Sequence, residues 1–471
     1  MAGRALLIRA LFQYAGHGVR AVITTALVLL CGNCTRANGN DTELRVWAFG
    51  SEGEALGPIA REFERANPGV HVRVQAIPWT AAHEKLLTAY VGGALPDVAQ
   101  LGNTWIPEFA ALNALEPLDA YVARDTALVP RSDYFPGVLA TNVVDSVLYG
   151  VPWYVDTRVM FYRTDLLRAA GIASPPKTWA AWRDAMVKVK KVQPAGSYPA
   201  LLPVNEWAQP VIFGMQAGGQ LLAEHGTRGA FRDAEFKRGF EFYVNLFRDS
   251  LAPALANTQI SNVFQEFASG RTAMYITGPW NVGEFKKRLP ANLQNAWMTA
   301  PLPGPDSTGI STAGGSSIVL MRGSAKKSIA WKFVTFMSDP ARQAKFYETT
   351  GDLPARRSAW ETPKLANDPY LAAFRTQLGN VAPVPAVPEI ELIVQLVALA
   401  AERAVRGRQT VDEALASLDA EVDAVLEKRR WMLERGKSRP LASLGATMEG
   451  VVPSEVEGPA LPFLGFLGTP K

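Results

Sequence analysis

The N-terminal part of the chain alternates between β-prone and helical segments, and this alternation limits the possible folds more than any other feature. β-Prone segments cover residues 44–49, 70–74 and 96–101, and segments with the apolar period of a helix lie between them, at 56–66 and 82–91. The order strand, helix, strand, helix, strand predicts a parallel sheet covered by helices. The expected fold class is therefore α/β.

Polar and aromatic side chains follow each of these three predicted strands. Ligands of such sheets bind beyond the carboxyl ends of the strands, so the three loops are expected to converge on one site. The candidate ligand-binding residues in these loops are Glu52, Glu54, Trp79, Asn103 and Trp105. Of the two carboxylates, Glu54 is favoured.

The length of the chain predicts more than one lobe, because 471 residues exceed what one compact core holds. Two segments, residues 151–156 and 312–317, have the character of crossovers between lobes. On the extended chain of the first crossover, Tyr154 and Asp156 point to the same side, and a carboxylate can accept strong hydrogen bonds from sugar hydroxyls. Both are candidate ligand-binding residues.

The N-terminus has the layout of a secretory signal. Basic residues up to Arg20 precede an apolar run over residues 21–30, which is too short for a membrane span of about 20 residues. We therefore predict a signal peptide over residues 1–34. Lipid attachment at Cys34 and cleavage near Ala37 without a lipid are both open, and a redox role for the Cys-Gly-Asn-Cys spacing is disfavoured.

Composition narrows the function further. The net charge of +4, from 48 basic and 44 acidic residues, gives no basic surface for nucleic acid. The 12 tryptophans suit carbohydrate, because an indole ring offers a flat apolar face and one N–H donor to a sugar. The four histidines fall in no metal-ligand spacing, and no nucleophile elbow or phosphate-binding loop is present, so we expect no metal and no cofactor.

Five passages in order along residues 43–435 carry a resemblance to a known family. They are residues 47–49 with the helix exit 63–70, then 96–98, 150–163, 278–280 and 407–415. Together they resemble the sugar-binding receptors of ATP-binding-cassette (ABC) importers, in the maltose- and trehalose-binding group. The resemblance implies two discontinuous lobes joined by hinge strands, which close on a sugar and then dock on a membrane permease.

The resemblance also implies lobe boundaries and a location. The expected N-lobe combines residues 43–152 and 312–358, and the expected C-lobe combines residues 157–305 and 365–435. The protein is expected to be a monomer in the periplasm or cell envelope. Residues 440–471 are rich in Pro and Gly without a sustained period, which predicts a disordered tail.

Further candidate site residues follow from the resemblance. Trp280 is expected to stack on a sugar, since Gly278-Pro279 makes a tight turn that exposes the ring. Arg356 matches an arginine that such receptors use on sugar, with pairing to an acid as its alternative. The remaining candidates are Glu206 and Trp207 in the loop before Pro210, and Gly314 and Gly315, which permit close backbone approach or serve as hinge glycines.

One difference from maltose-binding receptors limits the expected length of the ligand. Residues 389–399, where those receptors carry an aromatic platform, contain no aromatic side chain, although Glu391 or Gln395 could line the cleft. A disaccharide such as maltose or trehalose is therefore expected rather than a long maltodextrin.

Two other functions are compatible with parts of this pattern. A glycoside hydrolase could use Glu52, Glu54 or Asp156, but it needs two carboxyl groups about 5–9.5 Å apart, one of them with a raised pKa. A receptor of the same fold could instead bind a peptide, a polyamine or a metal chelate. We expect a sugar receptor and not an enzyme.

Overall fold

The computed structural model describes residues 42–437. The predicted signal peptide, Cys34, Ala37 and the predicted tail at 440–471 lie outside the described residues.

A six-stranded sheet forms the first lobe, with strand order β15-β6-β14-β3-β1-β2. Its strands are β1 (Thr42–Phe49), β2 (Val70–Ile77), β3 (Val98–Gly102), β6 (Gly150–Asp156), β14 (Gly314–Leu320) and β15 (Leu353–Pro354). The first strand pairs in parallel with the next two, as the alternation of segments predicted, while β14 and β15 run antiparallel to their neighbours. An α/β fold is therefore confirmed.

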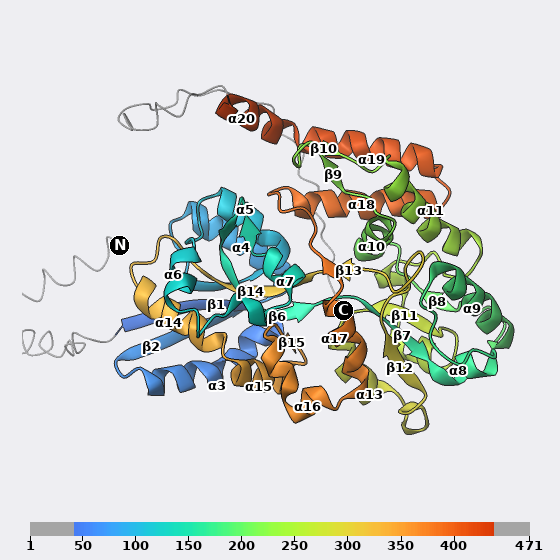
Figure 1. Ribbon diagram of the computed structural model, residues 1–471, viewed down its shortest axis with the longest axis horizontal. Coiled ribbons are helices and arrows are strands. Elements are labelled where there is room, and N and C mark those ends of the chain that lie inside the picture. The colour runs from blue at the N-terminus through green and yellow to red at the C-terminus, as the bar shows by residue number, and fades with distance from the viewer. Residues whose placement is uncertain (1–41, 438–471) are drawn as a thin grey trace, which may run out of the picture.

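Helices cover both faces of this sheet (Figure 1). They are α3 (Gly50–Ala66), α4 (Trp79–Val91), α5 (Ile106–Ala111), α6 (Asp119–Arg124), α7 (Pro136–Ala140), α14 (Lys327–Met337), α15 (Pro340–Thr350) and α16 (Pro363–Ala366). The boundary between α14 and α15 follows from local chemistry, because the Asp339 carboxylate accepts from the Arg342 N–H and Gly351 ends α15 with φ of 82°. A small hairpin, β4 (Val143–Val144) and β5 (Val147–Leu148), completes the lobe.

One expectation about this lobe was wrong. The residues between the strand at 44–49 and the helix at 56–66 were predicted to form a loop, but α3 begins directly at Gly50. Gly53 packs tightly in α3, since a Cβ there would lie 2.8 Å from the Ala48 carbonyl oxygen. The glycine therefore serves close packing of helix on strand and not a loop.

The second lobe contains a four-stranded sheet of order β12-β7-β11-β8. Its strands are β7 (Val159–Arg163), β8 (Ala200–Leu201), β11 (Met274–Thr277) and β12 (Trp297–Ala300). Around it lie α8 (Thr164–Ala169), α9 (Trp179–Val192), α12 (Val263–Ala268), α13 (Trp280–Arg288) and α17 (Ala372–Leu378). Pro175-Pro176 lies in the segment that separates α8 from α9.

A helical layer covers one side of the second lobe (Figure 1). It consists of α10 (Ala208–Gln216), α11 (Ala234–Arg248), α18 (Ile390–Val405), α19 (Val411–Val425) and α20 (Glu427–Lys437), with the hairpin β9 (Leu222–Ala223) and β10 (Arg228–Gly229). The sequence over 214–222 predicts a helix, but α10 ends at Gln216. Gly218 has φ of 94°, and a Cβ on Gly219 would lie 2.5 Å from the backbone of Phe236, so the chain turns there to let α11 approach.

Extended segments connect the two lobes. The first passes from β6 to β7 through residues 157 and 158, and the second passes from β13 (Ser311–Thr312) into β14. A third, β16 (Val381–Ala382), pairs in parallel with β13. The fold is thus the two-lobe arrangement that was expected, while the residue ranges assigned to each lobe stay a prediction.

Candidate functional site

A cleft of about 640 Å³ lies where the two lobes meet the connecting segments. It is lined by the starts of α3 and α4, by the end of β3, by β6 and β14, by the residue before α10, and by the starts of α13 and α18. Ten of the thirteen candidate residues named above line it: Glu52, Trp79, Asn103, Trp105, Tyr154, Asp156, Trp207, Trp280, Gly314 and Gly315. Their contact with a ligand stays a prediction, but they converge on one space.

The predicted preference for Glu54 does not fit this structure. Both glutamates lie near the start of α3, where positions two apart point in very different directions. Glu54 is exposed to solvent and does not line the cleft, whereas Glu52 is buried, with 6% of its surface exposed, and does. The carboxylate of this loop that faces the cleft is therefore Glu52.

Glu52 is held by two side chains from other elements. The Tyr154 hydroxyl donates to Glu52 Oε1 at 2.7 Å, and the Trp79 indole Nε1 donates to the same carboxylate at 3.3 Å. Burial, and then the charge of Glu52, raise the pKa of Tyr154 well above its ordinary value, so the phenol stays protonated and remains a donor. These bonds fix the carboxylate at the base of the cleft.

Asp352 is a second carboxyl group in this region, and the sequence patterns did not point to it. It lines the cleft beside Thr350, and burial together with the Glu52 charge raises its pKa to about 7. Near neutral pH a large share of Asp352 therefore keeps its proton and can donate a hydrogen bond as well as accept one.

A charged pair and an indole ring form the other side of the cleft. Arg158, in the connection between β6 and β7, donates to both carboxylate oxygens of Asp156, at 2.6 and 2.8 Å. Burial alone would lower the pKa of Arg158, but the Asp156 carboxylate outweighs it, and the net shift is upward. The guanidinium carbon also lies 4.8 Å from the ring centre of Trp280, so Arg158 covers one face of that ring.

Trp280 begins α13 and is unusually exposed for a large apolar side chain, at 44% of its surface. A Cβ on Gly278 would lie 2.0 Å from the Trp280 ring, so the glycine gives the indole room to fold back over the turn. An exposed ring at the edge of a cleft, with a cation on one face, leaves its other surface available for contact with a ligand.

Trp79 and Trp105 supply the aromatic part of the cleft wall that comes from the first lobe, and the buried ring of Phe49 packs against both. Trp79 and Trp105 pack edge to face at 5.6 Å, and Phe49 lies 5.2 and 5.7 Å from them. His83 supports this wall from behind, with its ring 5.0 Å from Trp105. Its bond to Glu108 at 2.6 Å raises the pKa of His83, which favours an imidazolium at this position.

Gly314 and Gly315 allow strand β14 to lie close against β6. Gly315 has φ of 122°, and a Cβ there would lie 2.2 Å from the Tyr154 carbonyl oxygen. No other residue fits this position without strain. Both glycines line the cleft, so the hinge role and the site role that the sequence left open are compatible.

One side-chain bond spans the cleft from lobe to lobe. The Thr104 hydroxyl, just after β3, donates to the carboxylate of Glu391 near the start of α18. Glu391 lines the cleft, as the sequence allowed, whereas Gln395 is exposed and does not. Glu206, the other candidate beside Trp207, lies outside the lining and accepts from Asn257 at 3.3 Å.

The predicted ligand role of Arg356 does not fit its surroundings. Arg356 is buried, with 6% of its surface exposed, and its Nε donates to the Asp133 carboxylate at 2.6 Å. Its guanidinium also donates to the carbonyl oxygens of Leu128 and Ser338. The alternative, pairing with an acid inside the first lobe, is what the structure contains.

Two other kinds of functional feature are absent from residues 42–437. Over this range no cluster of three or more His, Cys, Asp or Glu side chains has an arrangement that could hold a metal ion. None of the helices described there combines the length and the apolar character that a membrane span requires.

The fold and the cleft define a class: a two-lobed binding protein that holds its ligand where the lobes meet. The model of the family described as bacterial extracellular solute-binding protein matches residues 49–344, which is more than half of the chain, and the chain belongs to this family. The members of this family are non-catalytic receptors, so the expectation that the protein is not an enzyme is confirmed.

Individual relatives agree with this assignment. The chain is 50% identical to the sugar-binding protein MalE of Xanthomonas citri, whose structure matches with a TM-score of 0.81 over 83% of this chain and 99% of that one. A putative binding protein of Brucella abortus is 26% identical, over 79% of this chain and 89% of its own. A galactooligosaccharide-binding protein of Bacillus subtilis is 25% identical, over 76% of this chain and 83% of its own.

Proposed function

We propose that this protein is the receptor of an ABC importer and that it binds a neutral disaccharide, such as maltose or trehalose, in the cleft between its lobes. The observation that carries the proposal is the exposed ring of Trp280 facing a set of hydrogen-bonding carboxyl groups. A sugar ring presents one apolar C–H face and a rim of hydroxyls, so it matches a cleft with exactly these two kinds of surface.

The charges of the cleft support a neutral ligand. Asp156 is paired with Arg158, and Glu52 already accepts from three donors, while Asp352 is partly protonated near neutral pH. Each carboxyl group retains lone pairs that can accept a sugar hydroxyl. The 50% identical relative from Xanthomonas citri is described as a sugar-binding protein, which supports the same ligand class here.

The partner and the location belong to the same proposal. A permease in the membrane would recognise the closed lobes, and the family is extracellular, which agrees with an exported protein. A lipid on Cys34 stays a prediction.

Isothermal titration of the protein with maltose, trehalose, sucrose and maltotriose tests the proposal. We expect at least one disaccharide to bind with a Kd in the micromolar range or below, and maltotriose to bind more weakly than the best disaccharide. Absence of binding by all four sugars would refute the sugar proposal and favour a non-sugar solute. Chromatography of the bound sugar after prolonged incubation checks that it remains uncleaved.

A further inference from the structure

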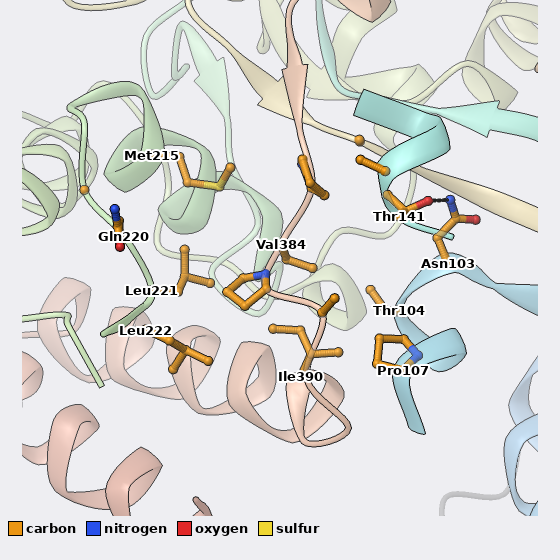
Figure 2. Close-up of a pocket in the computed structure, with 16 residues that line it drawn as sticks. Asn103, Thr104, Pro107, Thr141, Met215, Gln220, Leu221, Leu222, Val384 and Ile390 are labelled. Carbon is orange, nitrogen blue, oxygen red and sulfur yellow. Dashed lines mark hydrogen bonds between the residues drawn. The ribbon is translucent and has the colours of Figure 1, made fainter. Parts of the chain in front are cut away.

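A second cavity adjoins the cleft, and its chemistry differs from that of the cleft. It has a volume of about 360 Å³, within the range of ligand pockets, and lies between the lobes. Figure 2 shows Met215, Leu221 and Leu222 on one side of this space, with Thr104 and Pro107 opposite. We call this cavity the apolar annex.

The annex and the cleft share part of their walls. Asn103, Thr104, Ala313 and Val384 line both spaces. A ligand bound in the cleft could therefore extend past these residues without leaving the interface between the lobes.

Most of the annex wall is aliphatic. Leu221, Leu222 and Ile390 are buried side chains that face it, and proline and alanine side chains supply much of the rest. In contrast to the cleft, none of its lining residues in the described part of the chain is charged or aromatic.

The hydroxyl groups of the annex already have partners. Thr141 Oγ1 donates to the Val138 carbonyl at 2.7 Å and accepts from Asn103, and Thr104 donates to Glu391. A sugar ring in the annex would find no ring to stack on, and only the amide side chains of Gln220 and Asn103 could bond its several hydroxyls; each buried unpaired hydroxyl is costly. An alkyl or aryl group would instead gain from leaving water.

We propose that the annex takes the apolar aglycone or acyl group of a glycoside whose sugar part occupies the cleft. The ligand class is then an amphiphilic disaccharide, with a short hydrocarbon substituent of about four to eight carbons. This inference rests on the proposed function, because it places the sugar of the ligand in the cleft.

Titration with matched pairs of ligands tests the proposal. Methyl and hexyl maltoside form one pair, and 6-O-acetyl and 6-O-hexanoyl trehalose form another, all used below their micellar concentrations. Each buried methylene group can strengthen binding by up to about fourfold. We expect the longer member of at least one pair to bind at least about tenfold more tightly.

Variants that fill the annex locate the hydrocarbon chain. Ala386 and Ala140 are exposed residues at the wall of the annex, contributed by different lobes. Ala386→Trp or Ala140→Trp should reduce the gain in affinity of the longer ligand over the shorter one to about threefold or less. Ala366→Trp, at an exposed position at the end of α16 that does not line the annex, should keep the full gain. The gain is the ratio of the two Kd values measured on the same variant, so a general change in sugar affinity cancels. Thermal unfolding identifies any variant that does not fold.

The outcomes separate the two proposals. If maltose and trehalose bind but the longer ligands gain nothing, the annex proposal is wrong and the proposed function stands. The annex proposal is also wrong if both filling variants fold and keep the full gain. If neither the sugars nor their derivatives bind, the proposed function itself fails.

Discussion

Removal of the Trp280 ring is the sharpest test of the cleft. A tryptophan side chain can bury up to about 250 Å². With 44% of Trp280 exposed, about 110 Å² remains available. Arg158 already covers one face, so a sugar can cover about half of that area. At about 25 cal/mol per Å², this contact contributes about 1.4 kcal/mol, or a factor of about ten in Kd.

We therefore expect Trp280→Ala to raise the Kd of the best disaccharide about tenfold in isothermal titration, and Trp280→Phe to lose less. The free energy of unfolding should fall by about 1 kcal/mol or less, because only an exposed ring and one cation–π contact are lost. Trp431→Ala is the matched control, since Trp431 is 53% exposed on α20 and does not line the cleft.

Two results would refute this reasoning. Equal affinity of Trp280→Ala and the parent protein would show that the ring does not contact sugar. An equal loss of affinity in Trp431→Ala would show that exposed tryptophans affect binding without touching the ligand.

Three further predictions concern stability. Burial raises the pKa of Asp352 to about 7 from 3.8, so between these pH values the native state holds a proton that the unfolded chain has released, and stability should fall as the pH rises. In urea unfolding at about pH 5 and 8, Asp352→Asn should show a smaller fall in stability than the parent protein. An equal fall would contradict the raised pKa of Asp352. Gly315→Ala should lower the free energy of unfolding by about 2 kcal/mol or more, because its Cβ would collide with a carbonyl oxygen. The control Gly323→Ala, with no atom within 4 Å of the new Cβ, should change this free energy by less than about 0.5 kcal/mol. Arg356→Met should lower it by about 1–3 kcal/mol by leaving Asp133 unpaired, with sugar affinity unchanged; lost affinity at normal stability would restore its ligand role.

The three parallel strands of the first lobe, β1, β2 and β3, could be predicted from the sequence because these strands and the helices between them differ in apolar period. The start of α3 could not, because glycines usually disfavour helices, and here packing against β1 overrides that preference. The same error affected the site: in a loop, Glu52 and Glu54 are equivalent, but in a helix only Glu52 faces the cleft.

The rest of the site could not be predicted from the sequence, because its residues come together from distant parts of the chain. Asp352 is unremarkable in its own segment, and its significance comes from Glu52, which is 300 positions away. Arg158 could have been found by a local signal, since it follows Asp156 by two positions on an extended segment. Arg356 shows the converse, because its neighbourhood in sequence suggested a ligand while its partner in space is Asp133.

The bond between Thr104 and Glu391 has a consequence for the rate of ligand exchange. If the lobes open and close on the ligand as the proposed function requires, this bond must break at each opening, because it joins the two lobes; hydrogen bonds to charged groups are worth about 1.5–3 kcal/mol. It therefore shifts the resting population toward the closed form, from which a ligand escapes slowly but into which it also cannot enter. Only the open fraction of the molecules can capture a ligand, so the bond slows capture. In return, a bound ligand stays longer in the cleft, which leaves more time for the receptor to reach a transporter.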